Sequence, residues 1–206
     1  SIIKDLPYDR RQTTMESFKM CSECRAEYHN PEDRRFHAQP NACPACGPRL
    51  WLTDNEGHEL EVEQPLKKSR ELLAQGEIMA VKGLGGFHLI CDGTNQKVVT
   101  RLRTRKSRPN KPLAVMMDRL ETVRKYCYVS KLESDILQGI RKPILLLEKK
   151  GDHLPADIAP NNDSLGVMLP YTPLHYLLFT EQLQVLVVTS ANQSSLPLEY
   201  KNQSAL

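Results

Sequence analysis

The pattern of apolar and polar positions divides this chain near residue 62. Before that point, arginine, proline and cysteine are frequent, and apolar residues follow neither a helical nor a strand period. After it, short apolar runs alternate with segments whose apolar residues recur every three or four positions. Such alternation is typical of an α/β domain, in which helices cover a sheet. The sequence therefore predicts a small module over residues 1–62 and an α/β domain over residues 63–206.

The helices of the second part are indicated by their end signals. A glycine follows one helical segment, an asparagine precedes another, and a serine and glutamate at capping-box spacing open a third. We expect helices over residues 65–75 before Gly76, from Asn95 through Leu102, and from Ser130 and Glu133 to Gly139.

The strands are indicated by continuous apolar runs. They are expected at residues 78–81, 87–91, 113–117, 144–147, 165–169 and 185–188. Because these runs lack polar alternation, we expect helices on both faces of the sheet. Residues 80–81 and 88–89 are close enough in sequence to form a local antiparallel hairpin.

Composition narrows the classes of protein that the chain can belong to. Of its 206 residues, 40% are hydrophobic and 26% are charged, and the net charge is +3. No apolar run approaches the roughly 20 residues of a membrane span, and this charge alone does not imply nucleic acid. Residues 1–9 have no apolar segment typical of a signal peptide, so we expect a cytoplasmic protein. The chain starts with serine, and we expect it to be an excerpt of a longer protein.

Two CxxC pairs, separated by eighteen residues, are the strongest motif. Their members are Cys21, Cys24, Cys43 and Cys46. Four thiolates at this spacing are typical of a closed, structural zinc site. The alternative, a pair of disulfides, needs an oxidising compartment. His29 and His37 lie between the pairs and are possible replacement ligands, although four cysteines already complete a site.

A basic stretch between Asp92 and Asp118 is the first candidate for ligand binding. Its cations are Lys97, Arg101, Arg103, Arg105, Lys106, Arg108 and Lys111. The first three continue a helix, and the last four fall in a loop that enters a strand. Such a loop suits a polyphosphate or a carboxylate, but a solvated basic face is an equal alternative. RNA is a third reading, although aromatic residues for base stacking are missing from the stretch.

Two short motifs at strand ends are further candidates. Residues 82–88 contain three glycines beside Lys82 and His88, where backbone amides can approach an anion, or where a plain turn forms. Residues 189–192 follow a strand directly, and their small polar side chains suit a ligand or an ordinary loop.

Three other chemically versatile residues fit the core better than a site. Cys91 and Cys127 lie among apolar residues, and His175 falls in the first turn of a helix after Pro173. We expect all three to pack in the interior.

Several longer motifs occur in one order along nearly the whole chain. They are LPYDR at 6–10, TTM at 13–15, RRFHAQP at 34–40, CPACGP at 43–48, VKGLGGFHL at 81–89, LRTRKSRPNKPLAVM at 102–116, GVMLPYTPLH at 166–175 and TSAN at 189–192. This set closely resembles the HypF family of carbamoyltransferases, which help to build the cyanide ligands of NiFe hydrogenases. The N-terminal part resembles the second zinc finger of that family.

The resemblance implies an α+β arrangement of YrdC-like type from residue 63 onward, with a twisted mixed sheet and flanking helices. This fold, double-stranded RNA-binding-like in class, carries a positively charged concave face that binds ATP. The implied reaction forms carbamoyl-adenylate and pyrophosphate from carbamate and ATP, with Mg²⁺ accompanying the nucleotide. The carbamoyl group, derived from carbamoyl phosphate, passes to a cysteine of a HypE-type maturation protein through domains outside this chain.

The resemblance also implies site residues, at positions that match family motifs. Lys106 and Arg108 match a KxR element, and Ser190 and Asn192 match an SxN element; these four are the expected catalytic residues. Nucleotide- and carbamate-binding residues are expected at Lys82, His88, Arg105, Lys111 and Thr189. The zinc ligands are the four cysteines.

The chain departs from the family after the SxN element, where Ser195 and Leu196 replace the usual Gly-Glu. A turn that favours glycine is therefore altered near the site. The end of the YrdC-like domain, the acylphosphatase-like domain, the first finger and the carbamoyl-transferring domain are expected to lie outside this chain.

Two other functions remain open from the residues. A threonylcarbamoyl-adenylate synthase of tRNA modification has the same fold but does not normally carry such a finger. An RNA-binding module built from finger and basic groove would bind duplex RNA in a salt-sensitive way.

Overall fold

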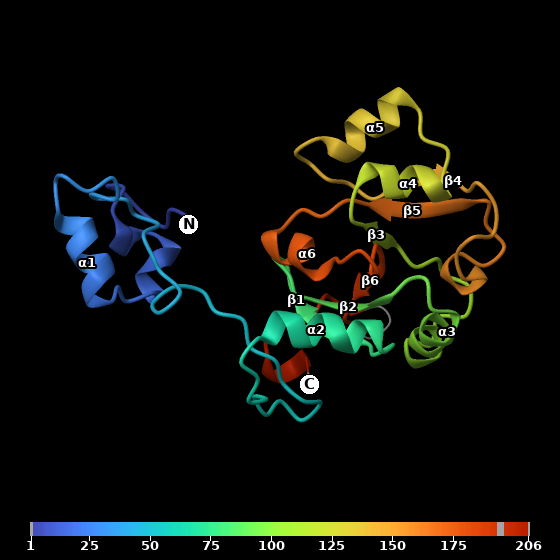
Figure 1. The fold of residues 1–206 in the computed structure, drawn as a ribbon, viewed down its shortest axis with the longest axis horizontal. Helices are drawn as coiled ribbons and strands as arrows, with labels where there is room; N and C mark the ends of the chain where they lie inside the picture. Colours follow the sequence, from blue (N-terminus) through green and yellow to red (C-terminus); the bar gives the residue numbers. More distant parts are fainter. Residues whose placement is uncertain (1, 193–195, 206) are drawn as a thin grey trace. The chain divides into compact units, whose positions relative to one another are not determined.

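The computed structural model describes residues 2–192 and 196–205 of the chain (Figure 1). It contains two compact units, Ser1–Trp51 and Leu52–Leu206. The smaller unit has little regular structure. Its elements are the 3-10 helices η1 (Arg10–Gln12) and η2 (Thr14–Ser17) and the helix α1 (Ser22–His29).

A buried arginine holds the smaller unit together. Arg10 is 7% exposed, and its guanidinium donates to the carbonyls of Gln39 at 2.6 Å, Asn41 at 2.7 Å and Phe18 at 2.8 Å. A planar guanidinium with five donors suits this task, because several carbonyls converge on it from separate loops. The LPYDR motif thus fixes the segment around residues 39–41 that precedes the second cysteine pair.

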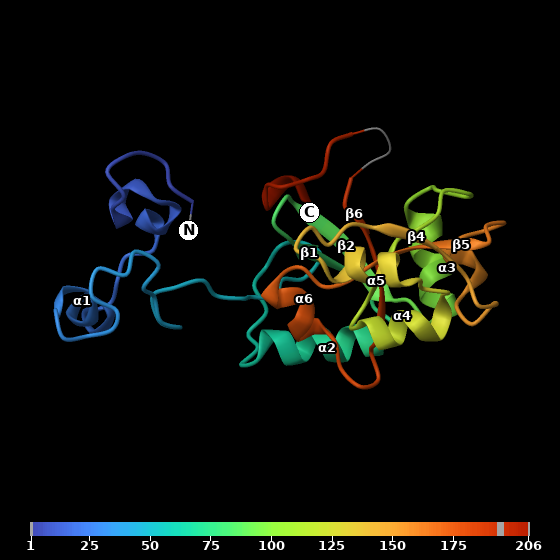
Figure 2. The same ribbon diagram turned by 90° about the horizontal axis from the view of Figure 1, so that it is seen from above.

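The larger unit is a sheet with helices on both faces (Figures 1 and 2). Its helices are α2 (Pro65–Ala74), α3 (Gln96–Arg105), α4 (Leu120–Tyr126), α5 (Lys131–Gln138) and α6 (Pro173–Leu178), with 3-10 turns η3 (Ala156–Ile158) and η4 (Gln203–Ala205). Its strands are β1 (Met79–Lys82), β2 (Phe87–Asp92), β3 (Val115–Met117), β4 (Leu145–Glu148), β5 (Ser164–Met168) and β6 (Val185–Ser190).

The six strands form one mixed sheet in the order β1-β2-β6-β3-β5-β4. Only β3 and β5 run parallel among the described strand pairs, and the other neighbours are antiparallel. The hairpin expected from the sequence is present, with Val81 opposite His88. Ser190 also lies opposite His88, so two predicted motifs meet in the sheet through β2 and β6.

The helix end signals form the expected caps. The Asn95 side chain accepts from the amides of Lys97 and Val98. The Ser130 side chain accepts from the Glu133 amide, and the Glu133 side chain accepts from the Ser130 amide, which together form a capping box. Gly76 has φ of +88°, a conformation that favours glycine after a helix.

Alternate residues of the central strands enter two separate cores. On one face, Val185 and Val187 of β6 pack with α3, α4 and α5. On the other face, Leu186 and Val188 pack with α2 and α6. A strand with period two therefore buries every side chain, which explains the continuous apolar runs. Cys91 and Cys127 are both buried in the first core, as expected.

The expectation of burial on both faces fails at the edge strand β4. Leu146 is 71% exposed and Ile144 is 56% exposed. One face of β4 is covered, since Leu147 is buried in the core that α4 and α5 share, whereas its other face is left exposed. Helices α1 and α4 are not indicated by the sequence, because both are short and neither begins with a capping side chain. Among the described residues, no helix combines the length and apolar character of a membrane span.

Candidate zinc centre and anion-binding groove

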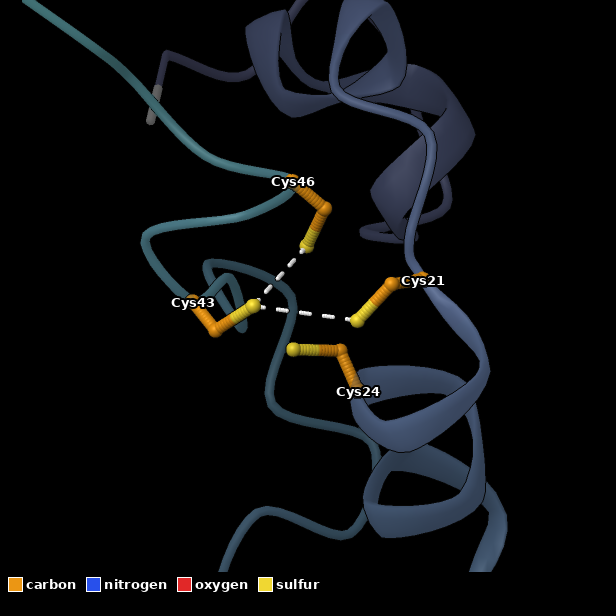
Figure 3. Close-up of side chains that lie close together, drawn as sticks. All are labelled: Cys21, Cys24, Cys43 and Cys46. Carbon is orange, nitrogen blue, oxygen red and sulfur yellow. Dashed lines mark hydrogen bonds between the residues drawn. The ribbon is translucent and has the colours of Figure 1, made fainter.

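Four cysteine side chains converge in the smaller unit (Figure 3). Cys21 is the N-cap of α1 and Cys24 lies in its first turn, so the helix start presents both thiols to one side. Cys43 and Cys46 lie on a tight turn in which the Cys43 carbonyl accepts from the amides of Cys46 at 3.2 Å and Gly47 at 2.7 Å. A Cβ at Gly47 would lie 2.9 Å from that carbonyl, so the turn requires glycine.

The separations between the sulfur atoms fit a tetrahedral zinc ion. The four Sγ atoms all lie within 4.8 Å of one another. Cys21 and Cys43 are 3.7 Å apart, and Cys43 and Cys46 are 3.8 Å apart. Four sulfurs about 2.3 Å from a central zinc have edges of about 3.8 Å. Four thiols at this spacing therefore suit structural zinc. The sulfur–sulfur distances are too long for disulfide bonds, which measure about 2.05 Å.

The cluster consists of thiols alone, without the histidines between the two pairs. Hydrogen bonds from the backbone lower the pKa of the Cys46 thiol to about 6, whereas burial raises the pKa of the Cys24 thiol to about 12. His37 does not join the cluster; its ring stacks on Tyr28 with centroids 5.0 Å apart. Four sulfur ligands close a zinc site, which leaves no position for substrate.

A groove of about 670 Å³ crosses one face of the sheet in the larger unit. Its lining comes from the ends of several strands and from the loop after α5. The lining residues are Leu84, His88, Pro112, Ala114, Ile140, Arg141, Lys142, Ile144, Met168, Tyr171, Val188, Thr189 and Ser190. Its volume is in the range of small-molecule sites. A second hollow, near Tyr126, measures only about 20 Å³ and is too small for a nucleotide.

The KxR and SxN elements meet beside this groove, which Ser190 lines but Lys106 and Asn192 do not in the described part of the chain. The Lys106 ammonium donates to the Ser190 carbonyl at 2.6 Å, across 84 residues of sequence. The Ser190 hydroxyl in turn donates to Asn192 Oδ1 at 2.7 Å. Burial, and then the nearby charge of Arg108, lower the pKa of Lys106. A partly desolvated ammonium beside a strand end is a favourable position for an anion.

The loop that carries Lys106 is built around Arg103. This residue is only 8% exposed. Its guanidinium donates hydrogen bonds to five backbone carbonyls, those of Arg108, Pro109, Lys111, Asp157 and Ile158. The bonds to Lys111 and Ile158 measure 3.1 Å and 3.3 Å. From the sequence, Arg103 was expected only as one of several cations in the basic stretch. Its contacts make it a positioning residue for the basic loop.

The other cations of the basic stretch that were expected at the site lie outside the described groove lining, and two of them are exposed. Arg108 is half-buried, while Arg105 and Lys111 are exposed. None of the three lines the groove among the described residues. Their expected role at the phosphates stays a prediction.

The glycine turn packs against the C-terminal segment at one side, while Leu84 is exposed and lines the groove. Lys82 donates to Asn202 Oδ1 at 2.7 Å and lies over the Phe87 ring. Gly86 has φ of +149°, and a Cβ there would overlap the Glu199 carbonyl and approach Leu198 Cγ to 2.8 Å. Gly86 therefore allows close packing of the 198–199 segment, and Lys82 is not in the described lining of the groove.

His88 and Tyr171 line the groove, and the buried His175 packs against Tyr171. His88 is half-buried and lines the groove, and burial lowers its pKa. His175 is 2% exposed, its Nδ1 lacks a hydrogen-bond partner among the described residues, and its ring lies 4.3 Å from that of Tyr171. Burial, and then His88, lower the pKa of His175 to about 4, so it is neutral at neutral pH. It packs in the interior, as expected from sequence.

The altered segment after the SxN element is partly described. Asn192 Nδ2 donates to the Leu196 carbonyl at 2.6 Å, so the chain beyond the element still orients this amide. Ser195 lies outside the described residues.

Comparison with known families assigns both units. Residues 71–206 match the family described as telomere recombination, which comprises Sua5, YciO and YrdC proteins. Residues 20–53 match the HypF finger. The second match contains all four cysteines of the cluster, and the first contains the groove.

Individual relatives extend the match to the whole chain. Carbamoyltransferase HypF of Rhodobacter capsulatus is 51% identical over 205 residues, which cover 100% of this chain and 27% of that protein. HypF of Synechocystis is 47% identical, with the same coverage. The chain thus spans about a quarter of the length of these relatives.

Comparison with solved structures gives the same family. A crystal structure of full-length HypF in a phosphate- and nucleotide-bound form matches with a TM-score of 0.83 and 47% identity, covering 100% of this chain and 27% of that one. Sua5 of P. abyssi with L-threonine shares 20% identity and a TM-score of 0.59 over 67% of this chain and 42% of that one, which shows a common fold alone. These matches place the chain in the HypF family, with a finger and a YrdC-like domain.

Proposed function

We propose that this chain is the finger and ATP-binding part of a carbamoyltransferase, and that its larger unit activates carbamate with ATP. The relatives that it matches at 51% and 47% identity are carbamoyltransferases. The single observation that carries the proposal is the 2.6 Å contact between Lys106 and the Ser190 carbonyl. It joins the KxR and SxN elements beside a groove large enough for a nucleotide.

The proposed reaction transfers adenylate to carbamate. A carbamate oxygen attacks the α-phosphorus, the bond from that phosphorus to the bridging oxygen breaks, and its electron pair leaves with pyrophosphate. Charge develops on the leaving group, and fixed cations stabilise it. We assign Lys106, Arg108 and Lys111 to the phosphates, with Arg105 beside them.

Ser190, Asn192 and Thr189 orient the substrates by hydrogen bonds. His88 lies near the carbamoyl end, because it is opposite Ser190 on the neighbouring strand. Lys82 belongs to the same end only if its contact with Asn202 opens. Magnesium enters as part of the Mg-ATP substrate, since no carboxylate lines the groove in the described ranges.

The remaining steps belong to other domains of the longer relatives. We infer a finger module to residue 62 and a YrdC-like domain from residue 63. Carbamoyl phosphate would supply the carbamate, and the carbamoyl group would pass to a cysteine of a HypE-type partner, in the cytoplasm. The 20% identity to Sua5 gives no comparable support for threonylcarbamoyl-adenylate synthesis.

Calorimetric titration of the zinc-loaded chain with Mg-ATP, with and without bicarbonate, tests the proposal. We expect saturable binding that weakens roughly 10- to 100-fold in Lys106→Ala, the cost of a lost charged hydrogen bond. Lys97→Ala removes the same charge from the exposed side of α3 and should bind like the unchanged chain.

If both variants bound ATP equally weakly, the effect would come from the overall positive charge and not from a specific contact of Lys106. An absence of ATP binding by a folded chain would contradict the proposal, and a salt-sensitive affinity for duplex RNA would then identify RNA as the ligand.

A further inference from the structure

The groove has a basic end that the KxR and SxN elements do not explain. Arg141 and Lys142 line it from the loop between α5 and β4. No sequence motif selects these two residues, because they stand alone after a helix and before an apolar run. In the described lining they are joined by His88 but by no carboxylate, so nothing there neutralises them.

The sheet order places this pair far from Lys106. The Lys106 ammonium meets β6, whereas the loop of Arg141 and Lys142 enters β4. Strands β3 and β5 lie between them. Three strand spacings of about 4.8 Å separate the two strands by roughly 14 Å. The Arg141–Lys142 pair and Ser190, whose carbonyl Lys106 contacts, therefore line separate parts of one groove.

The loop holds the two side chains differently. Lys142 is half-buried; its amide donates to the Gly139 carbonyl and its ammonium to the Gln138 carbonyl, both at 3.3 Å. Arg141 is exposed and makes no hydrogen bond or ion pair within the described residues. The backbone is thus anchored to the end of α5, and a guanidinium with five free donors borders the groove. Such a group matches phosphate oxygens in a bidentate way.

We propose that Arg141 and Lys142 bind the β- and γ-phosphates of ATP, and hold the pyrophosphate as it leaves. This inference rests on the proposed adenylation. In that reaction the attacking and leaving oxygens lie roughly in line through the α-phosphorus. With carbamate near His88 on β2 and the α-phosphate near Lys106 and Ser190, the leaving group points across the sheet toward β4.

This arrangement divides the cations by task. Lys106 contacts the phosphate that is attacked, while Arg141 and Lys142 take the charge of the departing group. Two cations suit pyrophosphate better than carbamate, because carbamate carries a single negative charge.

Calorimetry with three probes tests the inference on the zinc-loaded chain: Mg-ATP, magnesium pyrophosphate and AMP. We expect Arg141→Ala/Lys142→Ala to bind Mg-ATP and pyrophosphate roughly 10- to 100-fold more weakly than the unchanged chain, from the loss of charged hydrogen bonds. AMP affinity should stay the same, because AMP lacks the β- and γ-phosphates. The matched control is Arg124→Ala/Lys125→Ala, an exposed basic pair on α4 outside the groove lining.

The outcomes separate this inference from the proposed function. Unchanged Mg-ATP and pyrophosphate binding in the double variant, with binding by the unchanged chain intact, overturns the inference and leaves the function. Equal loss for AMP and ATP also overturns it, because the pair would then hold the nucleoside or the fold. Pyrophosphate binding that depends on the pair, without any ATP binding, supports the oxoanion site and contradicts adenylation. Binding of none of the probes by the folded chain overturns both.

Discussion

The two units of this chain reach stability by different means. In the described part of the smaller unit, Cys24 and Tyr28 are the only buried hydrophobic residues, while the buried Arg10 and the cluster of four cysteines link its loops. In the larger unit, two apolar cores cover both faces of a six-stranded sheet. A module with so little apolar burial depends on its metal, whereas the sheet can fold on packing alone.

The difference also separates structure from chemistry. The thiols converge on a closed tetrahedron, which leaves no place for a substrate. Polar residues of the larger unit instead line an open groove, and Lys106 contacts the carbonyl of Ser190, one of the lining residues. The most specific motif in the sequence therefore organises the chain, and the weaker motifs form the candidate site.

Removal of zinc should have the largest effect. Chelation, or Cys24→Ser, should unfold residues 1–51, because structural zinc in small fingers contributes about 10–16 kcal/mol of apparent binding free energy. The sheet should remain folded. Hydrogen exchange resolved by peptide measures both units at once. As a control, Cys127→Ala alters a buried thiol of the sheet and should leave the finger protected and the bound zinc in place. Joint unfolding of both units on chelation would contradict the comparison.

A core truncation should produce the opposite pattern. Leu102 is fully buried on α3, and Leu102→Ala should lower the free energy of unfolding of the larger unit by about 2–5 kcal/mol. Zinc stoichiometry should stay at one ion per chain. Denaturant unfolding followed together with zinc release checks both. Zinc loss at the same denaturant concentration as sheet unfolding would show that the units are not independent.

Loss of the Arg103 guanidinium should lower both the stability of the larger unit and its affinity for Mg-ATP, with a smaller effect than the two changes above. Arg103→Ala leaves several loop carbonyls without a donor, and each such group costs about 1–3 kcal/mol when it is buried. We expect a less stable larger unit and weaker Mg-ATP binding. Arg103→Lys restores one donor and should recover stability more than affinity, because the loop geometry needs the fork of the guanidinium. Equal recovery of both would reduce Arg103 to a stabilising residue.

The smallest expected effect is a pH dependence confined to the larger unit. Burial, and then His88, lower the pKa of His175 from 6.5 to about 4. The unfolded chain therefore binds this proton more readily. The stability is fully present above about pH 6.5 and falls as the pH drops toward 4. His175→Leu should flatten the dependence between pH 7 and 5, with His88 contributing in the same direction. Parallel curves for the variant and the unchanged chain would contradict this.

Much of the fold follows from local sequence signals. The caps at Asn95 and Ser130 and the apolar runs located most helices and strands, because both depend on near neighbours. Helix α4 has no comparable signal over its seven residues. The exposure of Leu146 depends on β4 lying at the sheet edge, which sequence patterns do not reveal.

The candidate site was predictable only in part, and for a similar reason. The KxR and SxN elements were recognised as motifs, and their meeting is a product of the strand order. Arg141 and Lys142 form no motif, and only the fold brings their loop to the groove. The binding role of Lys82 stays a prediction, and its contact with Asn202 depends on the 198–202 segment, which the glycine motif does not reveal.

Hydrogen exchange of the zinc-loaded chain, with and without Mg-ATP, tests the central claim most directly. The claim is that the groove binds the nucleotide and that the finger is structural. We predict slower exchange in residues 103–113, 139–144 and 186–192 when Mg-ATP is present, with no change in residues 20–53. Protection confined to residues 20–53, or no protection anywhere at a nucleotide concentration that saturates binding, would contradict the account.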